Sequence, residues 1–333
     1  MDDEHALLLA AGLQKKKMMT LLAVIGNLQP ACMRARIAKG TLQQLGLSNI
    51  PVGIGTEVFF GSQEYGYESK LPYLSKEHEL HSNGSLLLKQ TLEKTEDHTI
   101  ILVLQSGLTD AAFFLKEHTD LCCKKIKKVA IMGGVQNCNG EILLTGKYMQ
   151  PDNANNNTFD WAAATFLYAR LQELGISMTV VMREAAYNCQ VPFSMYDEME
   201  KTNNPIGACL KNRQQPSLEK LWQAACSPPN AKIRGTLPND RNRQWFVNVF
   251  CDGQDPGISD TEEIWPHTGR FNLYDPINLV AAVPCLQEMF FDPTCVEVNN
   301  IEHMVIGISK TKHGIKTPDT LRDFLCSTEI DGL

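Results

Sequence analysis

Acidic residues stand directly before two apolar helical stretches of this 333-residue chain. Asp2 and Asp3 precede the run Ala6 to Leu13, and Asp275 precedes an apolar run that begins at Pro276. Carboxylates at such positions cap the free N–H groups of a helix start, and Asp followed by Pro is an ordinary start signal. The functional alternative is that one carboxylate ligates a hard cation while its neighbour accepts hydrogen bonds from a substrate. The residues alone leave both interpretations open.

A run of amide side chains between residues 151 and 160 is a second candidate site. It follows the glycine pair at 133 and 134 and includes Asn153 and Asn156. Turn preference explains some of these asparagines, whereas a ligand with several hydroxyl groups would explain their number. Arg183, after another expected strand, either touches such a ligand or forms a structural ion pair, and we favour the ion pair.

Strand and helix periodicities alternate through the first part of the chain, which predicts an α/β fold with an open, mostly parallel, Rossmann-like sheet flanked by helices. The first helix begins directly after Met1, so the first strand of the sheet is absent from the expected order. We expect strands at Thr20–Ile25, Pro51–Gly55, Thr99–Leu104, Val129–Met132, Met178–Met182, Cys295–Val298 and His303–Ile308. We expect helices at Ala6–Leu13, Met33–Leu45, Leu108–Glu117, Trp161–Leu174, Leu218–Ala225 and Pro276–Pro284.

Polar or glycine-bearing loops follow several of these strands. They contain Gly26-Asn27, Gln105 to Gly107, Gly133-Gly134 and Arg183-Glu184. Parallel sheets bind their ligands at the carboxyl ends of the strands. We therefore expect the chemistry of this protein to lie in these loops.

Composition limits the class of protein. With 31 basic and 38 acidic residues the formal charge is −7, so no basic surface is expected for nucleic acid. The apolar runs are too short to span a bilayer and nothing at the start resembles a signal peptide, which predicts a soluble cytoplasmic protein with no membrane partner. Eleven cysteines without a staple pattern favour a reducing compartment. We expect one domain over residues 1–333, with a divergent elaboration at about 201–270.

Taken in order, these elements resemble the nucleoside hydrolase family, the inosine-uridine preferring nucleoside N-ribohydrolases. The stretch Asp2 to Ala10 is similar to the second half of the family's opening Asp-x-Asp-x-Gly-x-Asp-Asp motif. Val103 to Asp110 is similar to its Gly-Pro-Leu-Thr-Asn loop, and Met132-Gly133-Gly134 to its Met-Gly-Gly. The resemblance covers residues up to about Val191 and again Asn272 to Met289, as in a divergent member of the family.

The resemblance implies Ca²⁺ as cofactor and a ribonucleoside as small-molecule partner. Asp3 and Asp275 would coordinate the ion through carboxylates, and Gln105 through its backbone carbonyl. A further implication is a homo-oligomer, because family members often form dimers or tetramers. The residues implied in substrate binding are Asp2, Asn27, Asn153 and Asn156 for the ribose and Tyr274 for the nucleobase.

The sequence departs from the family pattern in three places. The family's general base falls in the half-motif that would precede Met1, its ribose-site glutamate falls at Ala154, and the histidine before its last calcium aspartate is Tyr274. The leading hypothesis is Ca²⁺-dependent hydrolysis of the N-glycosidic bond of ribonucleosides to ribose and free base, with no catalytic base assigned. The alternative is a catalytically impaired relative that binds a nucleoside or a protein partner without turnover.

Overall fold

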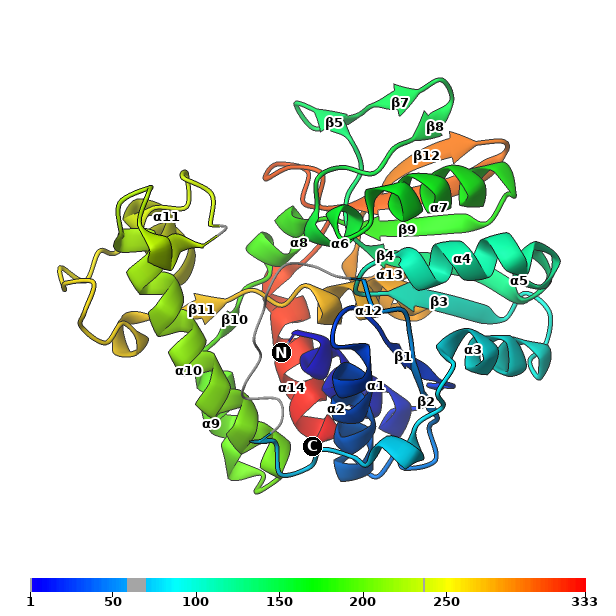
Figure 1. The fold of residues 1–333 in the computed structure, drawn as a ribbon. Coiled ribbons are helices and arrows are strands. Elements are labelled where there is room, and N and C mark those ends of the chain that lie inside the picture. Colours follow the sequence, from blue (N-terminus) through cyan, green and yellow to red (C-terminus); the bar gives the residue numbers. More distant parts are fainter. Residues whose placement is uncertain (1, 59–69, 236) are drawn as a thin grey trace.

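A five-stranded sheet lies at the centre of the computed structural model, which describes residues 2–58, 70–235 and 237–333 (Figure 1). Its strands are β3 (Ile100–Leu104), β4 (Ile126–Met132), β9 (Ser177–Val181), β12 (Thr294–Val298) and β13 (Ile301–Ile306). The order across the sheet is β12–β13–β9–β4–β3. Only β12 runs antiparallel to its neighbour. The predicted α/β class with a mostly parallel sheet is confirmed.

Helices cover both faces of this sheet, because alternate residues of a strand point to opposite sides. Val129 of β4 belongs to one apolar core, which it shares with α4 (Thr109–Glu117) and α7 (Trp161–Glu173). Val181 of β9 packs into the other core, together with α12 (Asp275–Ala282). The strands are therefore held between two apolar layers that fix where their carboxyl ends lie.

A separate parallel pair, β1 (Val24–Gly26) and β2 (Val52–Ile54), lies beside the main sheet. No strand in the described part of the chain joins β1 to β3. Every residue of β3 is only half-buried although the strand is an unbroken apolar run, whereas Val180 of β9 is 0% exposed. Parallel strands are normally buried on both faces. Among the described residues, β1 and β3 therefore each have one edge without a paired strand.

The first helix, α1 (Asp2–Lys15), runs alongside the last, α14 (Pro318–Gly332), as Figure 1 shows. Two glycines permit the close approach. A Cβ on Gly12 would lie 2.1 Å from the carbonyl oxygen of Thr328, and one on Gly332 would lie 2.2 Å from a carbonyl oxygen of α1. Larger residues at either position would force the two helices apart.

A helical region at one side of the molecule carries α9 (Ser194–Lys201), α10 (Pro205–Cys226) and α11 (Arg243–Phe250) (Figure 1). Its Trp222 shares an apolar core with Leu9 of α1. No described helix has an apolar stretch that could cross a membrane. The remaining elements are α2 (Ala31–Gln44), α3 (Gly84–Glu93), α5 (Thr119–Lys125), α6 (Asn155–Thr158), α8 (Arg183–Asn188), α13 (Pro284–Phe290), β5 (Asn137–Cys138), β6 (Glu141–Ile142), β7 (Leu144–Thr145), β8 (Tyr148–Met149), β10 (Val191–Pro192) and β11 (Arg270–Phe271).

Some elements differ from the expected ones. The strand expected at Thr20–Ile25 is shortened to β1, and the helix expected at Leu218–Ala225 is the end of the much longer α10. Pro216 lies inside α10, where its missing N–H normally favours a helix end. Burial of apolar residues on both sides of Pro216, such as Leu210 and Leu218, stabilises the continuous helix.

Candidate functional site at the carboxyl end of the sheet

The loop after β3 and the start of α12 are joined at the carboxyl end of the sheet. The side-chain amide of Gln105 donates to the backbone oxygen of Asp275 at 2.9 Å. The amide of Asn278 donates to the backbone oxygen of Leu104 at 3.2 Å. These two bonds place the positive end of α12 where the sequence predicts the chemistry.

Asp2 binds the start of α12 from the neighbouring helix. Its carboxylate accepts hydrogen bonds from the backbone N–H groups of Tyr274 and Asp275, each at 3.1 Å. First-turn N–H groups have no partner within their own helix. The capping role considered for Asp2 is therefore real, but it serves α12 and not α1.

The carboxylates of Asp2, Asp3 and Asp275 lie within electrostatic reach of one another. Burial raises the pKa of Asp275 well above its usual range, and the charges of Asp2 and Asp3 raise it further. Burial also raises the pKa of Asp2 to about 6, against the lowering effects of its hydrogen bond to the Asp275 N–H and of His5. The positive ends of α1 and α12 offset part of this repulsion.

A hard cation fits this cluster, because Ca²⁺ prefers carboxylate and carbonyl oxygens and would relieve the repulsion. Asp275 is 5% exposed and Asp3 is open to solvent. An ion bound between them would contact the buried Asp275 on one side and remain accessible to a ligand on the other. Across the described ranges, no three His, Cys, Asp or Glu side chains already form a metal-binding group. The assignment of Ca²⁺ to Asp3, Gln105 and Asp275 stays a prediction.

Tyr274 stands beside the carboxylates with a protonated hydroxyl. Burial raises its pKa, and the nearby Tyr187 and Asp2 raise it further. The amide of Asn272 donates to the Tyr274 hydroxyl at 3.3 Å. The ring of Tyr187 packs edge-on against the Tyr274 ring, with ring centroids 6.3 Å apart. An aromatic ring with a fixed O–H suits the predicted contact with a nucleobase, which nothing in the structure tests.

The asparagine-rich loop is built onto the end of β4. Asn156 donates to the backbone oxygen of Met132 at 2.9 Å, and Asn157 donates to that of Gly134 at 3.1 Å. A Cβ on Gly134 would lie 2.4 Å from the carboxylate of Asp152, so this position requires glycine. The glycine pair and the amide run therefore form one unit, which fixes Asn156 at the carboxyl edge where the ribose contact is predicted.

Asn27 spans the gap between the two sheets. Its side-chain amide donates to the backbone oxygen of Gly107 and to the carboxylate of Asp110, both at 2.9 Å. Asp110 also accepts from the backbone N–H and hydroxyl of Thr56, at 2.8 and 2.9 Å. The donor side of Asn27 is therefore used within the protein, and its predicted contact with ribose would rest on its amide oxygen alone.

A polar cavity of about 370 Å³ lies at the start of α8, after the carboxyl end of β9. Arg183 and Arg241 line it, and Arg183 donates to the side-chain oxygen of Asn153 at 3.2 Å. Tyr187 also lines it, and its contact with Tyr274 connects the cavity to the carboxylates. The carboxylates of Asp152 and Glu184 line the cavity as well, so its charges are mixed. Its two guanidinium groups are the side chains that could bind an anionic group of a ligand.

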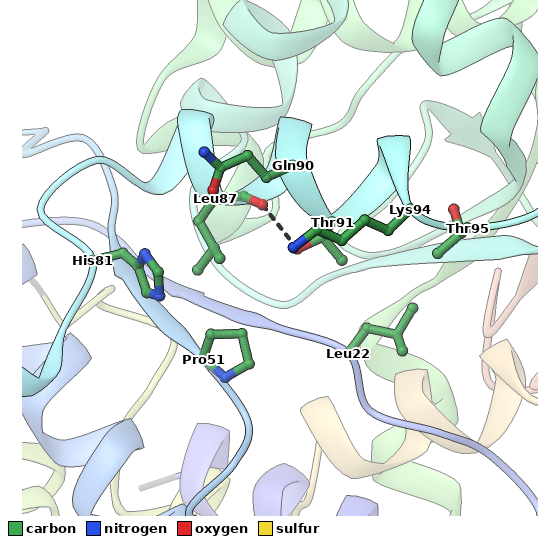
Figure 2. A pocket seen from close by; sticks show the side chains of 8 residues that line it. All are labelled: Leu22, Pro51, His81, Leu87, Gln90, Thr91, Lys94 and Thr95. Atoms are coloured by element: carbon green, nitrogen blue, oxygen red, sulfur yellow. Dashed lines mark hydrogen bonds between the residues drawn. The ribbon is translucent and has the colours of Figure 1, made fainter.

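A second cavity, of about 440 Å³, lies away from the carboxylates (Figure 2). Leu22 and Pro51 line it just before β1 and β2, and α3 covers it with Leu87 and Thr91. His81 also lines this cavity, at the amino ends of the strands. The cavity has no acidic lining residue, so it is not part of the candidate site.

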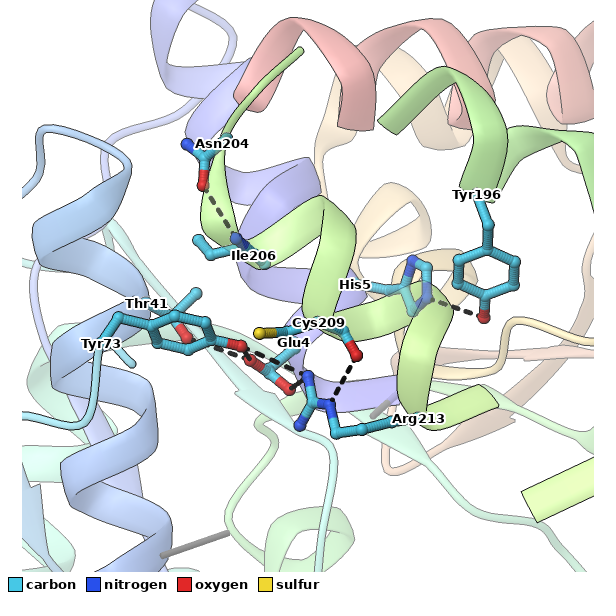
Figure 3. Close-up of polar contacts among 9 residues, drawn as sticks. All are labelled: Glu4, His5, Thr41, Tyr73, Tyr196, Asn204, Ile206, Cys209 and Arg213. Carbon is cyan, nitrogen blue, oxygen red and sulfur yellow. Dashed lines mark hydrogen bonds and ion pairs between the residues drawn. The ribbon is translucent and has the colours of Figure 1, made fainter. Parts of the chain in front are cut away.

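Glu4 and His5, which follow Asp3 in α1, point into the protein (Figure 3). The carboxylate of Glu4 forms an ion pair with Arg213 at 2.6 Å and accepts a hydrogen bond from the hydroxyl of Tyr73 at 2.8 Å. His5 contacts Glu329 at 2.6 Å and the hydroxyl of Tyr196 at 3.2 Å. Both groups are buried and paired, which marks them as structural.

Sequence reasoning did not select Tyr187 and Arg241, two of the residues that line the cavity. Tyr187 follows Arg183 by one helical turn on α8, so their shared face could have been found from that spacing. Arg183 binds Asn153 and not the acidic partners that were expected. Arg241 lies in the divergent region, where no motif indicates a ligand.

Neither a family model nor a curated protein matches the sequence. Among solved structures, the type III effector protein XopQ complexed with adenosine diphosphate ribose is similar over 100% of this chain and 90% of its own, with 28% sequence identity and a TM-score of 0.84. The effector protein XOO4466 has the same identity and coverage, with a TM-score of 0.82. A purine-preferring ribonucleoside hydrolase from Gardnerella vaginalis shares 15% identity over 99% of this chain and 95% of its own, with a TM-score of 0.58, which establishes a common fold.

Proposed function

We propose that this chain, which has a divergent nucleoside hydrolase-like fold, binds a ribose-containing small molecule at the carboxyl end of its sheet. The observation that carries the proposal is the convergence of Asp2, Asp3 and Asp275. A cavity that contains Arg183 and Arg241 is connected to them through the contact of Tyr187 with Tyr274. Carboxylates accept hydrogen bonds from sugar hydroxyls, and guanidinium groups bind phosphates. The two halves of the site thus match the two halves of a nucleotide-type ligand.

ADP-ribose is the probe of choice, because it is the ligand named for the XopQ complex. In our proposal a ribosyl group lies against Asp275 and Asn156, and the diphosphate extends past Tyr187 to the two arginines. Tyr274 donates a hydrogen bond from its protonated hydroxyl to the ligand. Ca²⁺, when bound by Asp3, Asp275 and the Gln105 carbonyl, would hold the ribose hydroxyls and make a bound water more acidic.

Thermal unfolding with ADP-ribose, adenosine or free ribose tests the proposal, each with Ca²⁺ and with a chelator. We expect ADP-ribose with Ca²⁺ to raise Tm most, and the chelator to remove much of the gain. Asp275→Asn should lose the Ca²⁺-dependent part, whereas Asp260→Asn, which changes an exposed acid between α11 and β11, should retain it. No shift with any of the three ligands would contradict the proposal.

Hydrolysis of the N-glycosidic bond is the second candidate function. Clustered carboxylates would stabilise positive charge on a sugar from which the base departs. The assay is Ca²⁺-dependent release of reducing sugar from inosine or uridine, with the same pair of variants. Release that Asp275→Asn abolishes would support hydrolysis, whereas ligand binding without release would identify a binding protein.

A further inference from the structure

A buried guanidinium group connects the end of α10 to the loop that leads into α11. Arg234, at the end of the 3₁₀ helix η3 (Lys232–Arg234), is 5% exposed. It donates to the backbone oxygen of Ala224, one of the last carbonyl groups of α10, at 2.9 Å. It also donates to the backbone oxygens of Pro238 at 2.7 Å and Arg241 at 3.2 Å. Arg234 therefore fixes this loop against the end of α10.

The side chain of Arg241 reaches from this loop to the polar cavity at the start of α8. Among the described residues that line the cavity, Arg241 alone comes from the helical region with α9, α10 and α11. Its guanidinium carbon lies 5.1 Å from the ring centroid of Trp245 on α11, a cation–π contact that restricts where the side chain points. Its ion pair with Asp240 is long, at 3.9 Å, and the Asp240 side chain is 75% exposed, so this pair contributes little. The charge of Arg241 is thus available to a ligand.

Arg241 decides the net charge of the cavity lining. Arg183 and Arg241 contribute +2, and Asp152 and Glu184 contribute −2, so the formal sum is zero. Without Arg241 the sum would be −1, which would repel an anion. The Asp152 carboxylate accepts hydrogen bonds from two groups of its own loop, at 2.8 and 3.2 Å, whereas a guanidinium group offers a planar set of donors that matches phosphate oxygens. The lining therefore accepts a phosphate only while Arg241 is in place.

The position of Arg241 in turn depends on the buried guanidinium group of Arg234. A paired set of hydrogen bonds from a guanidinium group to phosphate requires accurate placement, and a shift of about 1 Å is enough to weaken it. We propose, on the basis of the function proposed above, that Arg241 makes the site prefer phosphate-bearing ligands over neutral nucleosides. In this proposal Arg234 is a positioning residue, which acts on the ligand only through Arg241.

Calorimetric binding of ADP-ribose, adenosine and inorganic pyrophosphate tests the role of Arg241. Arg241→Gln should weaken ADP-ribose and pyrophosphate by at least about tenfold, because a hydrogen-bonded charge pair is lost. Adenosine, which has no phosphate, should change by less than about twofold. The matched control is Lys232→Gln, which removes an exposed positive charge from the same short helix as Arg234 and should change none of the three affinities. An unchanged ratio of ADP-ribose to adenosine affinity in Arg241→Gln would overturn the specificity role.

A double-variant cycle tests whether Arg234 acts through Arg241. Arg234→Lys keeps the charge, but its donors lie on a single nitrogen that cannot bind α10 and the loop together as the guanidinium group does. We expect ADP-ribose to bind about three- to tenfold more weakly, and adenosine to be unaffected. In the Arg241→Gln background, Arg234→Lys should cause no further loss. An equal loss in both backgrounds, or an equal loss for ADP-ribose and adenosine, would overturn the positioning role.

Hydrogen exchange in residues 237–242 measures the positioning without any ligand. Arg234→Lys should speed exchange there by at least about tenfold relative to Lys232→Gln, and equal exchange in the two variants would overturn the positioning role. The binding data also separate this inference from the proposed function. A chain that binds pyrophosphate through Arg241 but neither ADP-ribose nor adenosine would support the anion role and contradict ribose binding. A chain that binds none of the three would contradict both.

Discussion

The first turn of α1 carries two pairs of charged or polar residues with opposite surroundings. Asp2 and Asp3 lie at the carboxyl end of the sheet, where no Lys or Arg of the described residues forms an ion pair with them. Glu4 and His5, the next two, are buried and meet Arg213 and Glu329. Glu4 and His5 therefore have charged partners and connect α1 to other helices. The clustered carboxylates have no such partner and can interact with a ligand.

The largest effect should come from breaking the compensated pair. Arg213→Met leaves Glu4 buried without a counter-charge, and we expect the free energy of unfolding to fall by about 3–5 kcal/mol. Chemical denaturation measures this change. In the double variant with Glu4→Gln the loss should be smaller, because no charge is then stranded. A single variant within about 1 kcal/mol of the original chain would refute the structural role of the pair.

A second prediction contrasts two buried histidines. His5 has a carboxylate partner, whereas Nε2 of His303 in β13 has no hydrogen-bond partner and burial lowers the pKa of His303 to about 4. Between pH 6.5 and about 4 the unfolded chain binds a proton at His303 that the native protein does not bind. The free energy of unfolding should therefore fall by about 3 kcal/mol as the pH is lowered through this range.

Denaturation curves across this pH range, for the original chain and for His303→Gln, isolate the histidine contribution. The variant removes the titrating group, so its stability should depend less steeply on pH. Because every other group titrates alike in both chains, the difference between the two profiles reports His303. Identical slopes would show that His303 is protonated equally in the native and unfolded states.

Much of the fold could be predicted because the inner strands carry their own signal. β4 ends in the buried apolar run 129–132, β9 is buried from its second residue on, and both lead into polar or glycine-bearing loops. Burial on both faces produces that pattern. β1 is shorter than expected because its pairing is limited to β2, a tertiary fact that the residues at 20–25 do not encode. The long α14 carries mixed polar and apolar residues, and its packing depends on Gly12 of a helix at the other end of the chain.

The candidate site was predictable in its residue types but not in its contacts. Asp2, Asp3 and Asp275 were selected through their positions before helices and through the family resemblance. That Asp2 would cap α12 depends on a pairing across 273 residues, which no local pattern indicates. Arg241 could not be found for the same reason, because its place in the cavity depends on how the helical region with α9, α10 and α11 packs.

A third prediction concerns Asp275, which belongs to the cluster of carboxylates without a Lys or Arg partner. Asp275→Asn removes a buried carboxylate whose pKa is raised by burial and by the neighbouring Asp2 and Asp3. We expect the variant to be more stable by about 1 kcal/mol, as is usual when functional strain is relieved. Denaturation without added metal measures the gain, and Asp260→Asn should show none. A clear loss of stability would mean that the Asp275 carboxylate is a structural group.

The smallest effects belong to the opposite end of α1, where charges are exposed. Lys16 pairs with Asp331 at 2.6 Å, with side chains 35% and 54% exposed, so Lys16→Ala should change the free energy of unfolding by less than about 0.5 kcal/mol. Lys15 instead donates to the backbone oxygens of Asp331 and Gly332, at 2.8 and 3.0 Å, at the negative end of α14. Lys15→Ala should therefore cost more, about 1 kcal/mol. Equal losses of unfolding free energy for the two variants in chemical denaturation would contradict this. The Lys15 hydrogen bonds to the end of α14 would then contribute no more than the exposed Lys16–Asp331 pair.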